Sequence, residues 1–148
     1  MKTAKLIVTA VALAFALPAA ADEKLEVSGS PLTRNLVERH HEAIQASSGV
    51  EIDVSAVGCG KAMLDLIDGK VSVAAVSMSL PLAVAAAREQ AYAEGRILPL
   101  PVTLKYHDVG AVANELAFVT VGAPPPELQK VLMYLRSHEG RELILAGR

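Results

Sequence analysis

Three short stretches of small polar residues separate strand-like runs from helix-like patterns, and this repeat constrains the fold more than any other feature. The stretches are Ser28-Gly29-Ser30, Gly58-Cys59-Gly60-Lys61 and Ser77-Met78-Ser79. The runs before them are residues 25–27, 50–57 and 71–76, and the last is almost wholly apolar, as is typical of an interior strand of a parallel sheet. Strands that alternate with helices predict β-α-β units and therefore an α/β domain.

The predicted helices complete this pattern. Ser30 is a suitable N-cap before Pro31, and apolar residues at helical spacing continue to Gly49. Further helices are predicted over residues 62–67, from Pro81 to near Gly95, over 124–135, and over 137–146. Further strands are predicted over residues 97–104, 109–113 and 116–121. Together these elements predict a three-layer fold, a mostly parallel sheet with helices on both faces.

The N-terminus has the pattern of a secretory signal peptide. A basic head over residues 1–5 precedes the apolar run 6–17, and Pro18-Ala19-Ala20-Ala21 ends in small residues. The apolar run is shorter than the roughly 20 residues that a membrane-spanning helix needs. We therefore expect cleavage after Ala21, export to a bacterial periplasm, and a single domain over residues 22–148.

Composition excludes several classes of function. Cleavage would remove Lys2 and Lys5, so the formal net charge of −2 would become −4, which offers no general attraction to nucleic acid. Aromatic residues make up 3% of the chain, which argues against carbohydrate binding by ring stacking. The single cysteine cannot form an internal disulfide, and no pattern for a cofactor is present.

The three polar stretches predict an anion-binding site. In parallel sheets, ligands bind at the carboxyl ends of the strands, where these stretches lie. The helices that begin at Pro31-Leu32-Thr33 and Lys61-Ala62-Met63 have first N–H groups without intrahelical partners, which favour an anion. Side chains add donors and one positive charge; the predicted ligand-binding residues are Ser28, Ser30, Leu32, Thr33, Cys59, Gly60, Lys61 and Ser77. The alternative is that Ser30 only caps a helix and that Gly58 and Gly60 only form a turn.

Cys59 and the histidines give weaker signals. Catalysis by Cys59 would need a base and an orienting group, and no known thiol-enzyme motif surrounds it, so we expect no enzyme. An intermolecular disulfide, a redox-sensitive thiol and a small packed turn residue remain alternatives. His40 and His41 are expected in mid-helix, where adjacent side chains point about 100° apart and cannot bind one metal ion together.

The ordered set of these motifs resembles the periplasmic phosphate-binding proteins, the substrate-binding proteins of phosphate ABC importers. The residues that carry the resemblance are "LEVSGSPLTRNLVERHHEAIQASSGVEIDVSAVGCGKAMLDLIDGKVSVAAVSMSL", the segment "ILPLPVTLKYHDVGAVAN", and the C-terminal "LAFVTVGAPPPELQKVLMYLRSHEGRELILAG". Family members carry a second lobe between the equivalents of Asn114 and Leu116, whereas this chain returns at once. Cys59 or Gly60 stands where relatives usually carry serine.

This resemblance implies one lobe of a type 2 periplasmic-binding protein that binds phosphate or a similar oxyanion. Its implied partners are the membrane subunits of an ABC importer or a sensor protein, and two copies could face each other as a homodimer to restore a cleft. The alternative is an interaction or regulatory module that kept the lobe and lost its ligand.

Overall fold

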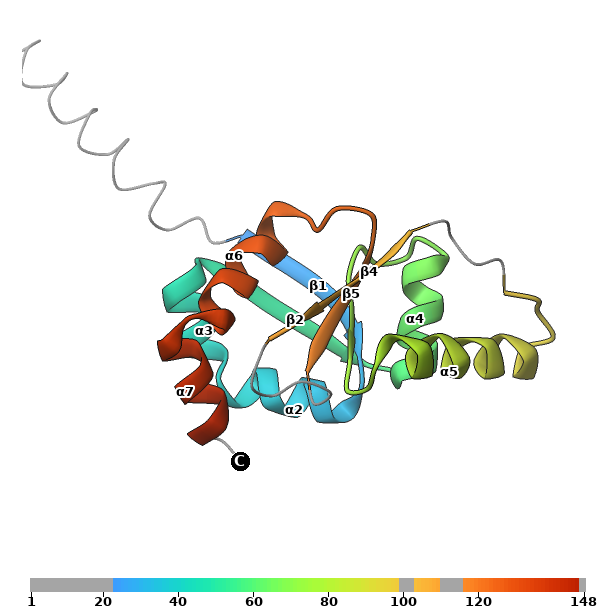
Figure 1. Ribbon diagram of the computed structural model, residues 1–148, viewed down its shortest axis with the longest axis horizontal. Coiled ribbons are helices and arrows are strands. Elements are labelled where there is room, and N and C mark those ends of the chain that lie inside the picture. The colour runs from blue at the N-terminus through green and yellow to red at the C-terminus, as the bar shows by residue number, and fades with distance from the viewer. Residues whose placement is uncertain (1–22, 99–102, 110–115, 147–148) are drawn as a thin grey trace, which may run out of the picture.

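The computed structural model describes residues 23–98, 103–109 and 116–146. The predicted signal peptide lies outside these residues. The described strands form one sheet in the order β2-β1-β3-β5-β4 (Figure 1). They are β1 (Glu23–Gly29), β2 (Val50–Ala56), β3 (Ala74–Val76), β4 (Leu104–Asp108) and β5 (Ala117–Val121).

The direction of the strands confirms the predicted α/β class and refines it. β1 pairs in parallel with β2 and with β3, whereas β5 runs antiparallel to both β3 and β4. Four strands therefore share one direction, and β5 is inserted among them in the opposite one. β4 and β5 are consecutive and adjacent in the sheet, a connection that antiparallel strands make without a crossover helix.

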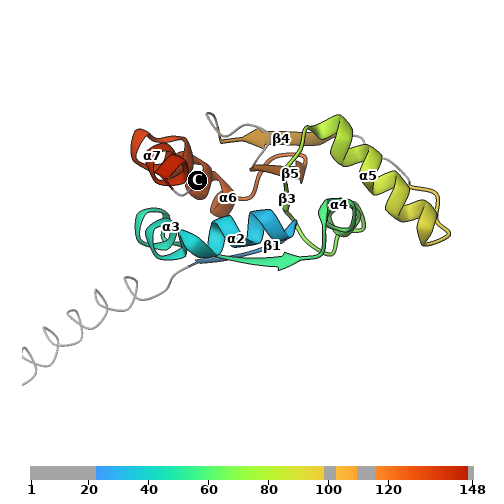
Figure 2. The same ribbon diagram turned by 90° about the horizontal axis from the view of Figure 1, so that it is seen from below.

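Helices cover both faces of the sheet, as predicted. On one face lie α2 (Pro31–Arg39), α3 (His41–Ser48), α6 (Pro126–Arg136) and α7 (His138–Ala146); on the other lie α4 (Cys59–Ile67) and α5 (Leu80–Ala93) (Figure 2). No helix within the described ranges is both long and apolar enough to cross a bilayer.

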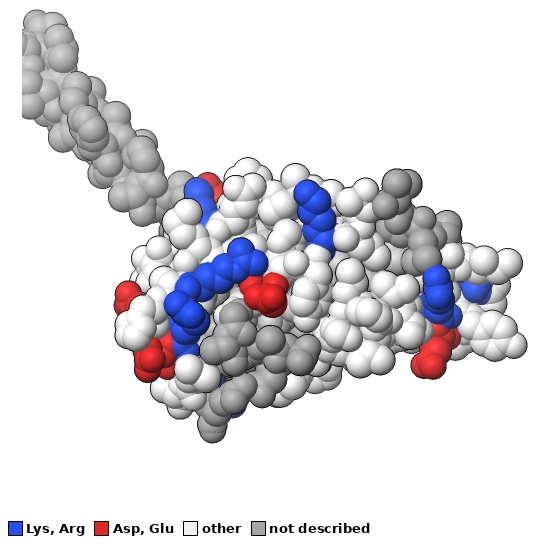
Figure 3. Space-filling model, in the orientation of Figure 1, with Lys and Arg blue, Asp and Glu red and all other residues white. Residues whose placement is uncertain are grey.

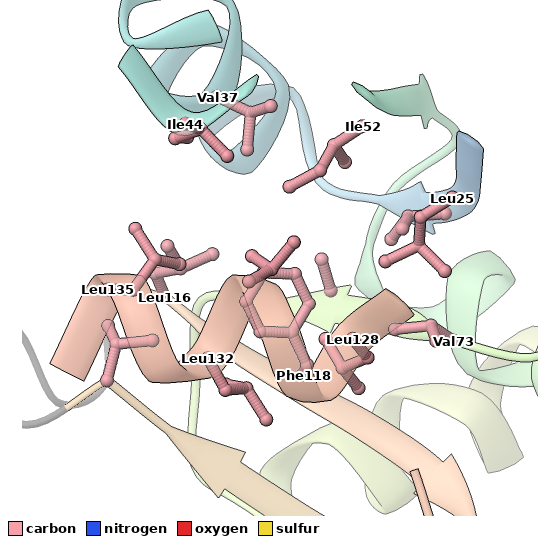
Figure 4. Close-up of a cluster of buried hydrophobic side chains, with 14 of the residues drawn as sticks. Leu25, Val37, Ile44, Ile52, Val73, Leu116, Phe118, Leu128, Leu132 and Leu135 are labelled. Carbon is pink, nitrogen blue, oxygen red and sulfur yellow. The ribbon is translucent and has the colours of Figure 1, made fainter. Parts of the chain in front are cut away.

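The alternation of side chains along the strands produces a core on each face. Along β5, Phe118 packs with the residues of α2, α3, α6 and α7, whereas Val119 packs with those of α4 and α5. Figure 4 shows the first of these cores, in which Phe118 lies among leucines of α6 and residues of β1 and β2. Phe118 and Val119 are both completely buried. Apolar packing therefore stabilises the sheet on both faces, and the loops and helix ends lie at the ends of its strands.

Two predicted elements differ from those observed. The predicted helix from Pro31 to Gly49 is divided at His40, whose N–H bonds to Val37 O at 3.2 Å and whose backbone leaves the helical region. His40 and His41 therefore lie at a junction between α2 and α3, and the expectation that they lie in mid-helix was wrong. Gly49 ends α3 in the left-handed region, as expected, with φ 74°.

Strand β4 lies between two predicted strands. Strands were predicted over residues 97–104 and 109–113, but Ile97 is almost fully exposed and Val109 is outside any strand. The observed strand uses the alternation of Leu104 and Tyr106, which pack against the core on the α4 side. The remaining residues of both predicted strands, 99–102 and 110–113, lie outside the described residues. Two smaller differences concern boundaries: β3 begins at Ala74 rather than residue 71, and α4 begins three residues before the predicted start at residue 62.

Candidate functional site

The three polar stretches meet at one edge of the sheet, as the sequence predicts. β1, β2 and β3 are parallel neighbours, so their carboxyl ends lie side by side. The stretch after β1 contacts the stretch after β2 directly. The N–H groups of Val57 and Gly58 both donate to Gly29 O, at 2.9 and 3.1 Å. We call this edge, formed by residues 28–33, 55–60 and 77–82, the carboxyl edge.

The side chains of Cys59 and Ser77 connect two of the three stretches. The Cys59 Sγ lies 3.7 Å from the Ser77 Oγ, a distance at which either group can donate a hydrogen bond. Both residues are partly exposed. Cys59 is the first residue of α4 rather than part of a preceding turn, so its thiol and the N–H groups of the first helical turn lie together.

The N-terminus of α4 offers backbone donors at this edge that no side chain caps. Its N-cap is Gly58, with φ 89° and ψ 155°, and glycine has no side chain to accept from the first N–H groups. The N–H groups of Cys59, Gly60 and Lys61 have no partner within the helix. They therefore carry the positive end of the α4 dipole toward the Cys59–Ser77 pair.

The N-terminus of α2 is closed by comparison. The Ser30 Oγ accepts from the Thr33 N–H at 3.1 Å, and Pro31 has no N–H to offer. The two hydroxyls of Ser30 and Thr33 also lie 2.9 Å apart and are both buried. These hydroxyls serve the helix cap, which is the alternative that the sequence left open for Ser30. The side chain of Leu32 is 58% exposed, and the prediction that its N–H group contacts an anion remains a prediction.

The sequence predicts that the positive charge of Lys61 attracts the anion, but in the structure this charge is paired with two carboxylates. Its Nζ lies 3.8 Å from the Asp65 Oδ1 and 3.7 Å from the Glu94 Oε1. The side chain therefore runs from the start of α4 toward a carboxylate one turn later and another at the end of α5. Two carboxylates lie within 4 Å of its single positive charge, so Lys61 brings no net positive charge to the carboxyl edge.

Ser28 is also engaged inside the fold. Its side chain is 3% exposed, and its Oγ donates to the Asp65 Oδ2 at 3.0 Å. Asp65, itself buried, is the residue that the sequence analysis missed. Its position four residues after Lys61 on one helix is the signal that would have identified the pair.

Gly60 has a packing role that the sequence did not reveal. A Cβ atom at this position would lie 2.7 Å from the Ala86 carbonyl oxygen of α5. The glycine lets α4 and α5 approach closely, and this contact accounts for the residue type independently of any ligand. The prediction that its N–H group contacts an anion remains a prediction.

His107 and His40 are partly buried within the fold, away from the carboxyl edge. The His107 Nε2 lies 3.0 Å from the Thr120 Oγ1, and the Thr120 hydroxyl donates to Gly122 O. Burial, Arg136 and Lys105 lower the pKa of His107, and burial and Arg39 lower that of His40. Within the described ranges, no group of three or more His, Cys, Asp or Glu side chains is placed to hold a metal ion.

Two adjoining cavities lie at the opposite edge of the sheet. A cavity of about 470 Å³ is lined there by Lys24, Glu26, Lys70 and Glu127, two residues of each sign. An adjoining cavity of about 520 Å³ is lined largely by the loops that follow α4 and β5. The lining of the first cavity therefore has no net formal charge, whereas Lys70 is the only charged residue among the described ones that line the second.

Comparison with known proteins gave two partial structural matches. No family model and no curated protein sequence matches the chain. A conserved protein of unknown function from Vibrio parahaemolyticus is 16% identical over 57% of this chain and 33% of its own, with a TM-score of 0.38. The tungstate ABC transporter from Geobacter sulfurreducens is 26% identical over 58% of this chain and 35% of its own, with a TM-score of 0.36. The chain thus spans about a third of the length of each.

Proposed function

We propose that this chain is an exported, non-enzymatic protein that binds a tetrahedral oxyanion of the phosphate type at the carboxyl edge. One observation carries the proposal: the uncapped N-terminus of α4 lies beside the Cys59–Ser77 pair, at the edge where three parallel strands end. N–H groups that converge at a helix N-terminus, with a hydroxyl beside them, are suited to a small anion. The resemblance of the sequence to periplasmic phosphate-binding proteins supports the same site.

Hydrogen bonds within the fold reduce the number of groups that can donate to the anion. The N–H groups of Cys59, Gly60 and Lys61 and the hydroxyl of Ser77 are the strongest candidates, together with the N–H of Leu32. The hydroxyls of Ser28, Ser30 and Thr33 are occupied by partners within the fold. The proposed anion is therefore held mainly by backbone donors, with the cation of Lys61 turned to Asp65 and Glu94.

The remaining parts of the proposal concern location and partners. The basic head, apolar run and small residues before Asp22 support export to the periplasm. The membrane subunits of an ABC importer, or a sensor protein, are the proposed partners. The absence of enzymatic activity is proposed because the described neighbour of the Cys59 thiol is the hydroxyl of Ser77, which is not a base.

The test is calorimetric titration of the purified protein with phosphate, sulfate, molybdate and tungstate. Heat of binding is expected for at least one oxyanion and not for chloride. No heat with any oxyanion above about 1 mM, where a contact worth about 4 kcal/mol would be half saturated, would contradict the proposal.

A matched pair of variants locates the site. Ser77→Ala removes a hydroxyl that can donate to a charged ligand, so affinity is expected to fall about tenfold or more. Ser47→Ala makes the same change at an exposed position of α3, outside the carboxyl edge, and should leave affinity unchanged. Equal effects of the two changes would place the anion elsewhere.

A second function is favoured by a different observation. The side chains of Ser28 and Lys61 are already paired within the fold, as expected of a lobe that has lost its ligand. The chain would then be an interaction or regulatory module, and the same titrations would give no heat.

A further inference from the structure

Strand β1 lacks a strand partner along most of one side. β2 pairs with it along its whole length, whereas β3 pairs only with its last two residues, Ser28 and Gly29. The Glu23 N–H donates to Gly49 O beside β2, and the Ser28 N–H donates to Val73 O beside β3. Because backbone groups alternate between the two sides of a strand, the N–H and C=O groups of residues 24 and 26 face the β3 side, where no described strand pairs with them.

The two adjoining cavities lie along this open side of β1. The first, of about 470 Å³, is lined by three consecutive residues of the strand, 24–26. It shares residues 70–72 of the loop after α4 with the second, of about 520 Å³. The start of β1, the loop after α4 and the loop after β5 lie at the same end of the sheet (Figure 1). The open backbone groups therefore border a space that an extended chain can enter.

The charged side chains around the first cavity are not paired. They are Lys24, Glu26, Lys70 and Glu127, and none of them forms an ion pair within 4.0 Å with a residue that the structure describes. Elsewhere opposite charges are joined: in Figure 3, positive side chains over α6 and α7 and along the later part of α5 lie against negative ones. Lysines and carboxylates without partners around one cavity suit a ligand that carries charges of both signs.

The second cavity adds an apolar surface to this polar one. Val71, Val121 and Pro125 are among its lining residues, and the side chain of Val121 is 46% exposed. An apolar side chain of a ligand would leave water on entering this cavity, which favours binding.

We propose that the two cavities bind a short peptide in an extended conformation. Its amide groups pair with the open backbone of Lys24 and Glu26, as an added strand does. The two lysines attract its carboxylate end, Glu26 and Glu127 attract its ammonium end, and an apolar side chain enters the second cavity. A free amino acid has both charges but no amide group to pair with β1. This site lies at the opposite edge from the carboxyl edge, and the inference does not depend on oxyanion binding.

Calorimetric titration of the purified protein with the tripeptide alanyl-leucyl-alanine tests the site. Heat of binding is expected for this tripeptide. Three probes should bind about tenfold or more weakly: the tripeptide acetylated and amidated at its ends, which lacks both charges; the tripeptide methylated at both amide nitrogens, which lacks the donors to β1; and leucine alone.

A matched set of variants locates the peptide. Lys70→Gln and Glu26→Gln each remove one charge at an exposed position of the cavity lining, and each should weaken tripeptide binding about tenfold. Lys105→Gln in β4 and Glu89→Gln in α5 make the same changes at exposed positions outside the cavities and should leave affinity unchanged. Circular dichroism checks that each variant is folded.

Several outcomes would overturn the inference. No heat with the tripeptide above about 1 mM would do so, as would equal affinity for any of the three altered probes, or equal effects of the cavity and control variants. Titration of the same samples with oxyanions separates this inference from the proposed function. A protein that binds an oxyanion but no tripeptide refutes the peptide site alone, and one that binds the tripeptide but no oxyanion refutes anion binding alone.

Discussion

At the residue scale, Ser30 connects the sheet edge to the first helix. Its Oγ accepts from the Thr33 N–H, and the buried Thr33 hydroxyl bonds to the same atom. Ser30→Ala is therefore expected to lower the free energy of unfolding by about 1–2 kcal/mol, because a helix cap and the partner of a buried hydroxyl are lost together. Urea denaturation measures the change. Ser47→Ala, at an exposed position in α3, should change stability by less than about 0.5 kcal/mol.

Cys59 lies where a hydroxyl would serve an oxyanion at least as well as a thiol. Serine is a stronger hydrogen-bond donor than cysteine, and the α4 N–H groups remain in place after the change. Cys59→Ser is therefore expected to preserve or increase the affinity for the oxyanion measured by calorimetry. A variant that folds but loses all anion binding would instead indicate that the thiol itself is required.

Gly60 is limited by the contact between two helices. Gly60→Ala would place a Cβ atom 2.7 Å from the Ala86 carbonyl oxygen. Overpacking of this kind costs about 1–3 kcal/mol, which exceeds the gain of about 1 kcal/mol in helix propensity. The variant should therefore unfold at a lower urea concentration than the wild type. An unchanged or higher midpoint would mean that α4 and α5 can separate without loss.

At the element scale, ion pairs join the ends of α4 and α5. The Arg96 guanidinium donates to both carboxylate oxygens of Asp68, at 2.9 and 2.6 Å, and Lys61 connects α4 to Glu94. The hydrogen bonds from Arg96 lower the pKa of Asp68 below its ordinary value, although burial opposes the change. These ion pairs therefore connect the C-terminal end of α5 to both the first turn and the C-terminal end of α4.

The lowered pKa of Asp68 predicts a pH dependence. Because the pKa is lower in the folded state, the pair stabilises the fold above the unfolded value of about 4, and this stabilisation is lost as the pH falls through the folded pKa. Asp68→Asn should lower the free energy of unfolding at pH 7 by at most about 1 kcal/mol, since the pair is partly exposed. The difference from wild type should disappear at pH values well below 4.

Urea denaturation at pH 7 and at low pH measures this effect. Glu89→Gln, a change of the same type at an exposed position of α5, is the control and should have little effect at either pH. A deficit of Asp68→Asn that is equally large at low pH would show that the carboxylate charge is not its cause.

At the scale of the whole molecule, the sequence predicts the layers better than it predicts the contacts. The strand-to-helix alternation is local, so the α/β class and the shared edge of three turns could be read from spacing. The pairing of Lys61 with Glu94 depends on how α4 meets α5, which no local pattern specifies. The position of β4 was missed for a related reason: Leu104 and Tyr106 become inward-facing only once β5 is beside them.

The two cores should unfold as one unit because they share a single sheet. Phe118 and Met63 are completely buried on opposite faces, in cores that the strands separate. Phe118→Ala and Met63→Ala are expected to cost about 3–5 and about 2–5 kcal/mol, each shifting one cooperative transition with an unchanged slope. Met133→Ala, at a position 77% exposed, should change stability by less than about 0.5 kcal/mol. A second transition in either buried variant, seen when fluorescence and circular dichroism disagree, would mean that the α4–α5 layer unfolds separately from the rest.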